Sequence, residues 1–80
     1  MLQPSLAVAL RVKEQHEPAL LALPGVFGVA IGSGADHSGP EGPCIVVLAS
    51  AALPDGAVPD SIEGVAVYVV RAEPPRQQRL

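Results

Sequence analysis

The stretch Leu23-Pro24-Gly25-Val26-Phe27-Gly28-Val29-Ala30-Ile31-Gly32 separates two kinds of sequence pattern. Before it, apolar residues recur at helical spacing, and from Val26 onward they alternate as they do in a strand. Pro24 disfavours a helical conformation at the residue before it, and Gly25 can adopt a positive φ angle that other residues avoid. The stretch therefore predicts the corner at which a helix ends and a sheet begins.

Residues 4–22 are predicted to form the helix that leads into this corner. Ser5 can cap the first turn, or Pro4 can occupy it. Pro18 lies inside the segment, where it removes one backbone hydrogen bond and costs about 3 kcal/mol. Because the apolar stripe continues past Pro18, the pattern favours one kinked helix over a second short helix that begins there.

Three strands are predicted after the corner, at residues 26–32, 44–50 and 65–71. The loop at 33–43 is rich in Gly, Ser and Pro, and neighbouring strands favour an antiparallel hairpin. The prolines and glycines of residues 51–64 make that segment mostly irregular. The strand order is either a meander or one in which the third strand crosses over to flank the first. The expected fold is α+β, with one N-terminal helix on a three-stranded, mainly antiparallel sheet, as in a ferredoxin-like fragment or a similar two-layer sandwich.

Length and composition indicate one small domain without an excess of charge. The chain has 80 residues, of which 49% are hydrophobic and 16% charged, and its net charge is −3 at pH 7. It lacks the basic footprint of a nucleic-acid binder and the run of about 20 apolar residues that spans a bilayer. Cys44 is the single cysteine, so no internal disulfide can form. We expect one domain at 1–72 and a flexible tail at 73–80, in a cytoplasmic protein that binds neither nucleic acid nor membrane.

The second and third predicted strands, at 44–50 and 65–71, are apolar on both faces. A sheet with one wet face normally alternates apolar and polar residues, and one helix covers only one face. Exposed apolar surface costs about 25 cal/mol per Å². We therefore expect a second subunit or a partner protein to bury the other face, unless the loop at 51–64 folds back over it. The speculative contact residues are Val46, Leu48, Val67 and Val69.

The candidate chemical sites are weak. Asp36-His37-Ser38 contains the residue types of a hydrolase triad, but adjacent side chains cannot converge as a triad requires. His16 lies on the apolar helix stripe, where a packed histidine is commoner than a general base. A zinc site of His16, His37, Cys44 and Asp36 matches no known ligand spacing, and Cys44 is most simply a small buried hydrophobe. We expect a non-enzymatic protein without catalytic residues, metal or cofactor.

Two further patterns have simple explanations. The glycines between residues 25 and 34 do not form a phosphate loop, because such a loop follows a strand and opens a helix. The basic C-terminal end can dock on an acidic partner, but an inert solvated tail is the simpler interpretation. Its arginines are Arg71, Arg76 and Arg79. The carboxylates of the irregular segment are interpreted as solvated turn residues, and they are Asp55, Asp60 and Glu63.

Three segments together resemble a group of small, uncharacterised bacterial α+β domains. They are residues 16–29 (HEPALLALPGVFGV), 43–47 (PCIVV) and 62–67 (IEGVAV). The group runs as a helix, LPGVxGVxxG, a hairpin and a final IxGVxVxVV strand, alone or ahead of trypsin-like peptidase domains. The LPGV turn is also similar to that of heavy-metal-associated domains and subtilisin propeptides, but this chain lacks their CxxC motif or opening strand.

The resemblance covers about residues 13–71 and transfers no catalytic residue. It implies one alternative function, a peptidase-associated regulatory or propeptide-like domain. The leading expectation remains a non-enzymatic interaction or assembly module that self-associates through an apolar sheet face. Its partner is then a second copy of the chain or another protein.

Overall fold

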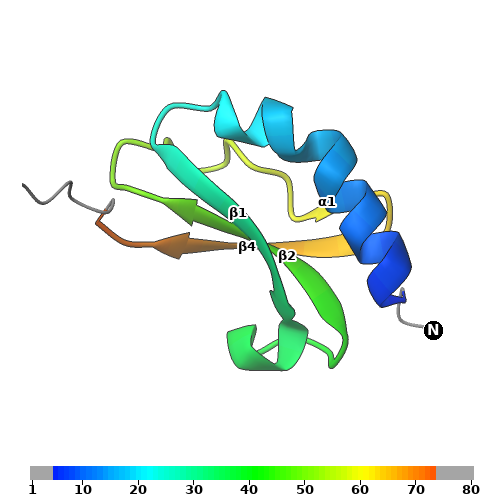
Figure 1. The fold of residues 1–80 in the computed structure, drawn as a ribbon. Coiled ribbons are helices and arrows are strands. Elements are labelled where there is room, and N and C mark those ends of the chain that lie inside the picture. Colours follow the sequence, from blue (N-terminus) through cyan, green and yellow to red (C-terminus); the bar gives the residue numbers. More distant parts are fainter. Residues whose placement is uncertain (1–4, 74–80) are drawn as a thin grey trace, which may run out of the picture.

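The computed structural model describes residues 5–73, which form one helix packed on a four-stranded sheet (Figure 1). The elements in chain order are helix α1 (Leu6–Leu21), strand β1 (Val26–Ser33), 3-10 helix η1 (Gly34–His37), and strands β2 (Pro43–Ala49), β3 (Ser61–Ile62) and β4 (Val65–Arg71). The expected α+β class is confirmed. The short strand β3 is an addition that the sequence pattern did not predict.

Helix α1 is a single helix with Pro18 inside it. Ser5 is its N-cap, and the Ser5 hydroxyl accepts a hydrogen bond from the backbone N–H of Val8 at 3.2 Å. The helix continues past Pro18 to Leu21, so the one-helix interpretation is confirmed. Neither α1 nor η1 has the length and hydropathy needed to cross a membrane, and they are the helices of the described residues.

The corner after α1 requires glycine at position 25 for two reasons. Gly25 has φ +86°, which L-residues rarely adopt. The backbone of the 50–53 segment also passes very close, since a Cβ atom on Gly25 would lie 2.5 Å from the backbone nitrogen of Leu53. The Gly25 carbonyl accepts a hydrogen bond from Ser50 N–H at 2.8 Å. The corner therefore joins the end of the helix to the segment that follows β2.

The sheet is mixed, with strand order β1-β2-β4-β3. β1 and β2 form the predicted antiparallel hairpin. β4 lies beside β2, as in a meander, but runs parallel to it and does not flank β1. Parallel neighbours need a connection of about a dozen residues or more, and residues 50–64 provide it. The three long strands therefore have the expected meander order, but the last one is parallel where a meander is antiparallel, and the alternative in which it flanks the first strand is wrong.

Strand β3 joins β4 through a two-residue turn. Glu63 has φ +49° and Gly64 has φ +82°, and two positive φ angles define the tight turn that suits a twisted antiparallel hairpin. β3 pairs only with the start of β4, at Ala66 and Val65. The rest of the β4 edge is lined by the crossover segment.

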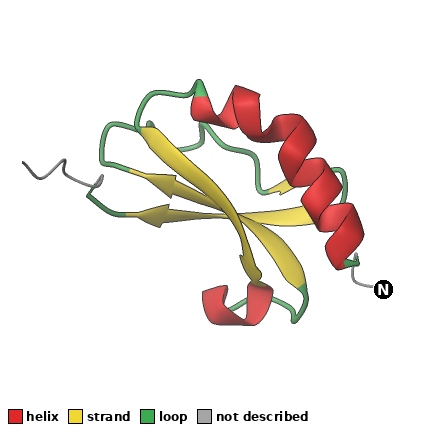
Figure 2. Ribbon diagram, viewed as in Figure 1, coloured by secondary structure: helices red, strands yellow, loops and turns green. Residues whose placement is uncertain are grey.

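The core lies between the helix and one face of the sheet (Figure 2). Its buried side chains are Ala9, Val12, Leu20, Ile45, Val47, Val65 and Val67. Val58 and Ile62 of the crossover segment pack against this same cluster. The crossover segment thus extends the helix layer, so the expectation that residues 51–64 fold back over the other face is wrong. The physical reason is the parallel crossover, which returns on the side of the sheet that carries the helix.

Candidate interaction surface

The strand register assigns the residues of the three long strands to two faces. On the face away from α1, Gly28 pairs with Leu48, which in turn pairs with Val70. In the next row Ala30 pairs with Val46, which pairs with Tyr68. Gly32 lies beside Cys44 in the row after that. We call this surface the open face, and its residues are Gly28, Ala30, Gly32, Cys44, Val46, Leu48, Tyr68 and Val70. None of them carries a charge at neutral pH.

One end of the open face is covered by the segment from η1 to Gly39. The His37 ring stacks on the Tyr68 ring, with centroids 5.0 Å apart and planes at 13°. Gly39 packs so close to Tyr68 that a Cβ atom there would overlap the hydroxyl. Figure 2 shows η1 on the side of the sheet opposite α1. Cys44 is buried beneath this end, whereas Ala30 is exposed and Leu48 and Val70 are partly exposed.

The four speculative contact residues do not form one surface. Val46 and Leu48 lie on the open face, whereas Val67 and Val69 share the helix face with Ile45 and Val47. Val46 and Val67 are also buried within the chain itself. Val69 is 39% exposed, and α1 packs mainly on β1 and β2. An interaction role for these residues stays a prediction, but they cannot act as a single patch.

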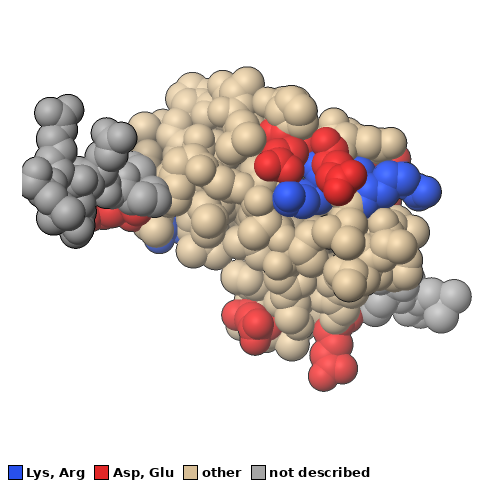
Figure 3. All heavy atoms as spheres, viewed as in Figure 1, with Lys and Arg blue, Asp and Glu red and all other residues tan. Residues whose placement is uncertain are grey.

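The outer edge of β1 is a second unpartnered feature of the sheet. β1 is the terminal strand of the order, and no strand of the described chain pairs with its outer side. Among residues 5–73, residues 27–33 take part in no backbone hydrogen bond outside the strand ladders. Edge strands usually carry charges or prolines that prevent pairing with another chain. Val26–Ser33 carries neither, and Figure 3 shows uncharged surface over this strand.

The two histidines lie on opposite sides of the sheet. His16 Nε2 is 2.8 Å from the carboxylate oxygen Oε2 of Glu63, on the helix side. His37 lies over Tyr68, on the open face. Within residues 5–73, no three His, Cys, Asp or Glu residues are grouped closely enough to hold a metal ion. Asp36 and His37 belong to η1 and Ser38 follows as its cap, so the three do not converge.

A groove of about 400 Å³ runs beside His16, between α1 and the 59–62 segment. Its walls are mainly apolar and include Ala19, Leu23 and Ile62. Nothing in the local pattern identified Glu63, 47 residues away, as the partner of His16. The ion pair joins the β3–β4 turn to the helix, so the arrangement supports packing of that turn on α1.

Cys44 is a free and buried thiol. Burial is the main cause that raises its pKa, and the negative charge of Asp36 adds to the effect. A hydrogen bond with the backbone of Gly32 acts in the opposite direction. Because the thiolate is the nucleophile and the metal ligand, a raised pKa leaves Cys44 as a small buried hydrophobe.

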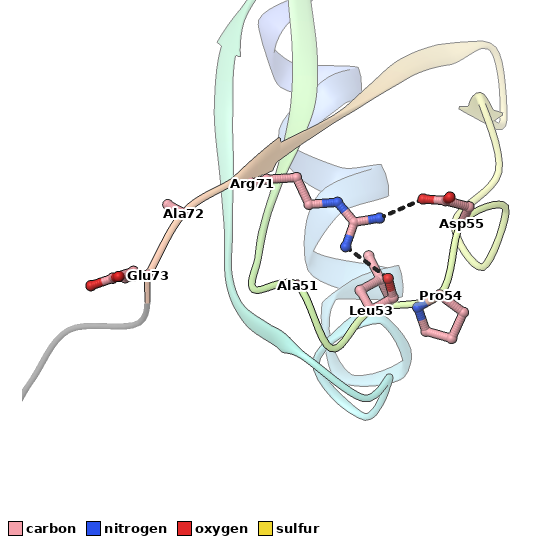
Figure 4. A pocket seen from close by; sticks show the side chains of 7 residues that line it. All are labelled: Ala51, Leu53, Pro54, Asp55, Arg71, Ala72 and Glu73. Carbon is pink, nitrogen blue, oxygen red and sulfur yellow. Dashed lines mark hydrogen bonds and ion pairs between the residues drawn. The ribbon is translucent and has the colours of Figure 1, made fainter.

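Arg71 holds the crossover segment against the end of β4 (Figure 4). Its Nη1 donates to the carbonyl oxygens of Ser50 at 2.9 Å and Leu53 at 2.7 Å, and its Nη2 donates to Asp55 at 3.0 Å. An open hollow of about 650 Å³ adjoins this guanidinium. Arg71 is thus engaged within the chain, and Asp55 is its partner. Arg76, Arg79 and the rest of the expected tail from residue 74 onward lie outside the described residues.

Comparisons with known proteins identify no relative: no family model, curated protein or solved structure matches this chain. The resemblance to small bacterial domains therefore stays a prediction from the sequence pattern. Fold alone does not assign function, so the functional argument depends on the two unpartnered surfaces of the sheet. The sequence predicted the apolar character of both faces of the later strands, and residues 26–33 carry no charge. Their position at an edge was not predicted, because it depends on the strand order.

Proposed function

We propose that this protein is a non-enzymatic interaction module that self-associates through its sheet. The observation that carries the proposal is that, within residues 5–73, no strand pairs with the outer edge of β1 and only one end of the adjoining uncharged open face is covered. Apolar surface in contact with water costs free energy, and contiguous apolar patches mark interaction sites. The open backbone edge adds hydrogen-bonding groups that a second strand can satisfy.

A second copy of the chain is the partner that fits these surfaces best. Most soluble homo-oligomers are two-fold symmetric, so the same patch meets itself and must be self-complementary. A charged patch would repel its own copy, whereas β1 and the open face carry no charge. The net charge of −3 is small and is screened at physiological ionic strength, where the Debye length is about 8 Å.

The test is the mass of the full chain in solution across the micromolar range. Sedimentation or light scattering is expected to show a concentration-dependent species at twice the 8.2 kDa monomer mass or above. Binding of a hydrophobic dye reports the exposed apolar surface of the chain independently. A chain that stays monomeric up to about 100 µM, near the weak end of specific association, and binds no dye would refute the proposal.

A further inference from the structure

We infer that the second copy joins at the edge of β1, so that β1 pairs antiparallel with the partner's β1 and the two sheets become one continuous sheet. The inference rests on the proposed self-association and names its contact. It is supported by the unpaired edge, by the side chains on the neighbouring flank of α1, and by an obstacle on the open face.

The edge available for pairing is short and sharply bounded. A bulge between Val26 and Gly28 shifts the β1–β2 register, and bulges twist an edge away from further pairing. The 3-10 helix begins at Gly34 and ends the strand. The regular part is therefore residues 28–33, a length typical of a complete strand in globular proteins.

Three exposed leucines lie on the flank of α1 that adjoins this edge. Leu6, Leu10 and Leu21 are 40–56% exposed, and Val69 is the other large exposed hydrophobic residue of the described chain. At 100° per residue the three leucines fall within about 60° of one another.

Their flank is opposite Ala19, which lines the groove beside β3. Because β1 and β3 are the two ends of the sheet, the leucine flank lies on the β1 side. The flank carries Lys13 and Glu17 as a 2.9 Å ion pair, and Glu14 lies at its margin, so both signs of charge are present where two such flanks meet.

The layer geometry allows these flanks to meet. Strands are about 4.8 Å apart, so a two-fold axis between two β1 strands lies about 2.4 Å beyond each of them. α1 packs on β1 and β2. A helix above that seam lies about 5 Å from the axis, and hence about 10 Å from its symmetry mate, which is the spacing of packed helices. Edge pairing thus buries the leucines and also gives hydrogen-bond partners to the backbone groups at the outer edge of β1.

The pairing register follows from the pleat. Directly opposed residues of antiparallel strands point to the same face, and a two-fold axis normal to the sheet keeps both helices on one side. The axis must therefore pass through a residue opposed to its own copy. Residues 28–33 have two central positions, Ala30 and Ile31, and we place the axis at Ala30, which pairs Ala30 with Ala30, Val29 with Ile31, and Gly28 with Gly32 of the second copy. Each pair then joins residues of one face.

Direct packing of two open faces is less favourable. Stacked sheets pack about 10 Å apart across interdigitating side chains. The segment from η1 to Gly39 stands on this face over Tyr68 and keeps a second sheet from lying flat on it. Edge pairing avoids that obstacle and places the uncovered parts of the two open faces side by side.

The first experiment is disulfide trapping of the full chain with Ala30→Cys, which places two thiols across the axis. Opposed strand residues have Cα atoms about 4.5–5.5 Å apart, within disulfide range. Cys44 can stay because it is buried. We expect Ala30→Cys to give a covalent dimer under mild oxidation at least about tenfold faster than Ala52→Cys, an exposed control on the crossover segment.

The second experiment separates the edge from the open face by charge substitution. Leu10→Lys, on the helix flank, is expected to weaken the dimer by at least about tenfold in Kd, and by more than Val70→Lys, on the open face, weakens it. Circular dichroism and thermal melting check that both variants fold. A dimer weakened by Val70→Lys but not by Leu10→Lys, with Ala30→Cys no faster than the control, would overturn the edge inference yet keep self-association. A monomer at every concentration would overturn both.

Discussion

Replacing Gly25 with alanine tests whether the corner between α1 and β1 depends on close backbone packing. Gly25→Ala introduces a Cβ atom 2.5 Å from the backbone nitrogen of Leu53, at a residue with φ +86°. Two costs are therefore expected. A left-handed backbone conformation costs an L-residue about 1–2 kcal/mol, and overpacking against atoms that cannot rotate away costs about 1–3 kcal/mol. The sum is about 2–5 kcal/mol.

Gly56→Ala is the matched control. Gly56 has φ +78°, and a Cβ atom there would meet nothing within 4 Å. Gly56→Ala and Gly25→Ala share the strain of a left-handed backbone conformation. Both also remove the same conformational entropy from the unfolded chain. The difference between the two variants thus isolates the contact with Leu53, at about 1–3 kcal/mol. Since an 80-residue domain is stable by about 4–12 kcal/mol in total, the effect should be large.

The measurement is urea or thermal unfolding of both variants at one protein concentration. For a domain of this size, 1 kcal/mol corresponds to about 4–8 °C in Tm. Gly25→Ala should therefore melt at least about 4 °C below Gly56→Ala. Equal melting temperatures would refute the reasoning, because they would show that only the φ angle, and not the approach of the 50–53 backbone, requires glycine at the corner.

Three other changes follow from the same contacts. Arg71→Leu removes two charge-assisted hydrogen bonds to carbonyl groups and should lower the free energy of unfolding in urea by about 1–2 kcal/mol. Asp55→Ala changes a fully exposed carboxylate and should leave the urea midpoint of unfolding unchanged. Folding raises the pKa of Cys44. The thiol's contribution to stability is therefore complete below its unfolded pKa of about 8.5 and is lost as pH rises through the folded pKa. Between pH 7 and 10 the free energy of unfolding should fall more steeply for the native chain than for Cys44→Ala. His37→Ala removes the ring stacked on Tyr68, so stability should fall by about 1 kcal/mol and dye binding to the open face should rise; unchanged dye binding would contradict a covering role for His37.

Local signals predicted the parts of the fold that neighbouring residues decide. The N-cap at Ser5, the apolar stripe, and the Leu23-Pro24-Gly25 corner lie within one or two turns of the residues that they control. The β1–β2 hairpin was predictable because neighbouring strands usually pair. The apolar character of both sheet faces was also correct as a sequence property.

Contacts between distant segments decided the rest of the sheet. β4 runs parallel to β2 because the crossover segment returns on the helix side, where Val58 and Ile62 reach the core. This placement also divides the four predicted contact residues between the two faces of the sheet. The sequence shows which residues of each strand share a face of that strand. It does not show which face of β2 continues into which face of β4, because that depends on the register between the strands. The register places Val46 and Val67 on opposite faces of the sheet.

The sequence by itself determined that a capped helix turns at Gly25 into an uncharged strand, because caps, proline restrictions and alternation act over a few residues. Only the tertiary structure decided that this strand is an edge, that Gly25 packs against Leu53, and that Arg71 holds the crossover segment. Each of these features joins residues at least 16 positions apart in the sequence, as Arg71 and Asp55 are. No local pattern specifies which distant segments will meet. The candidate interaction surface belongs to this second group, since an uncharged strand becomes a pairing edge only when the fold leaves it without a neighbour.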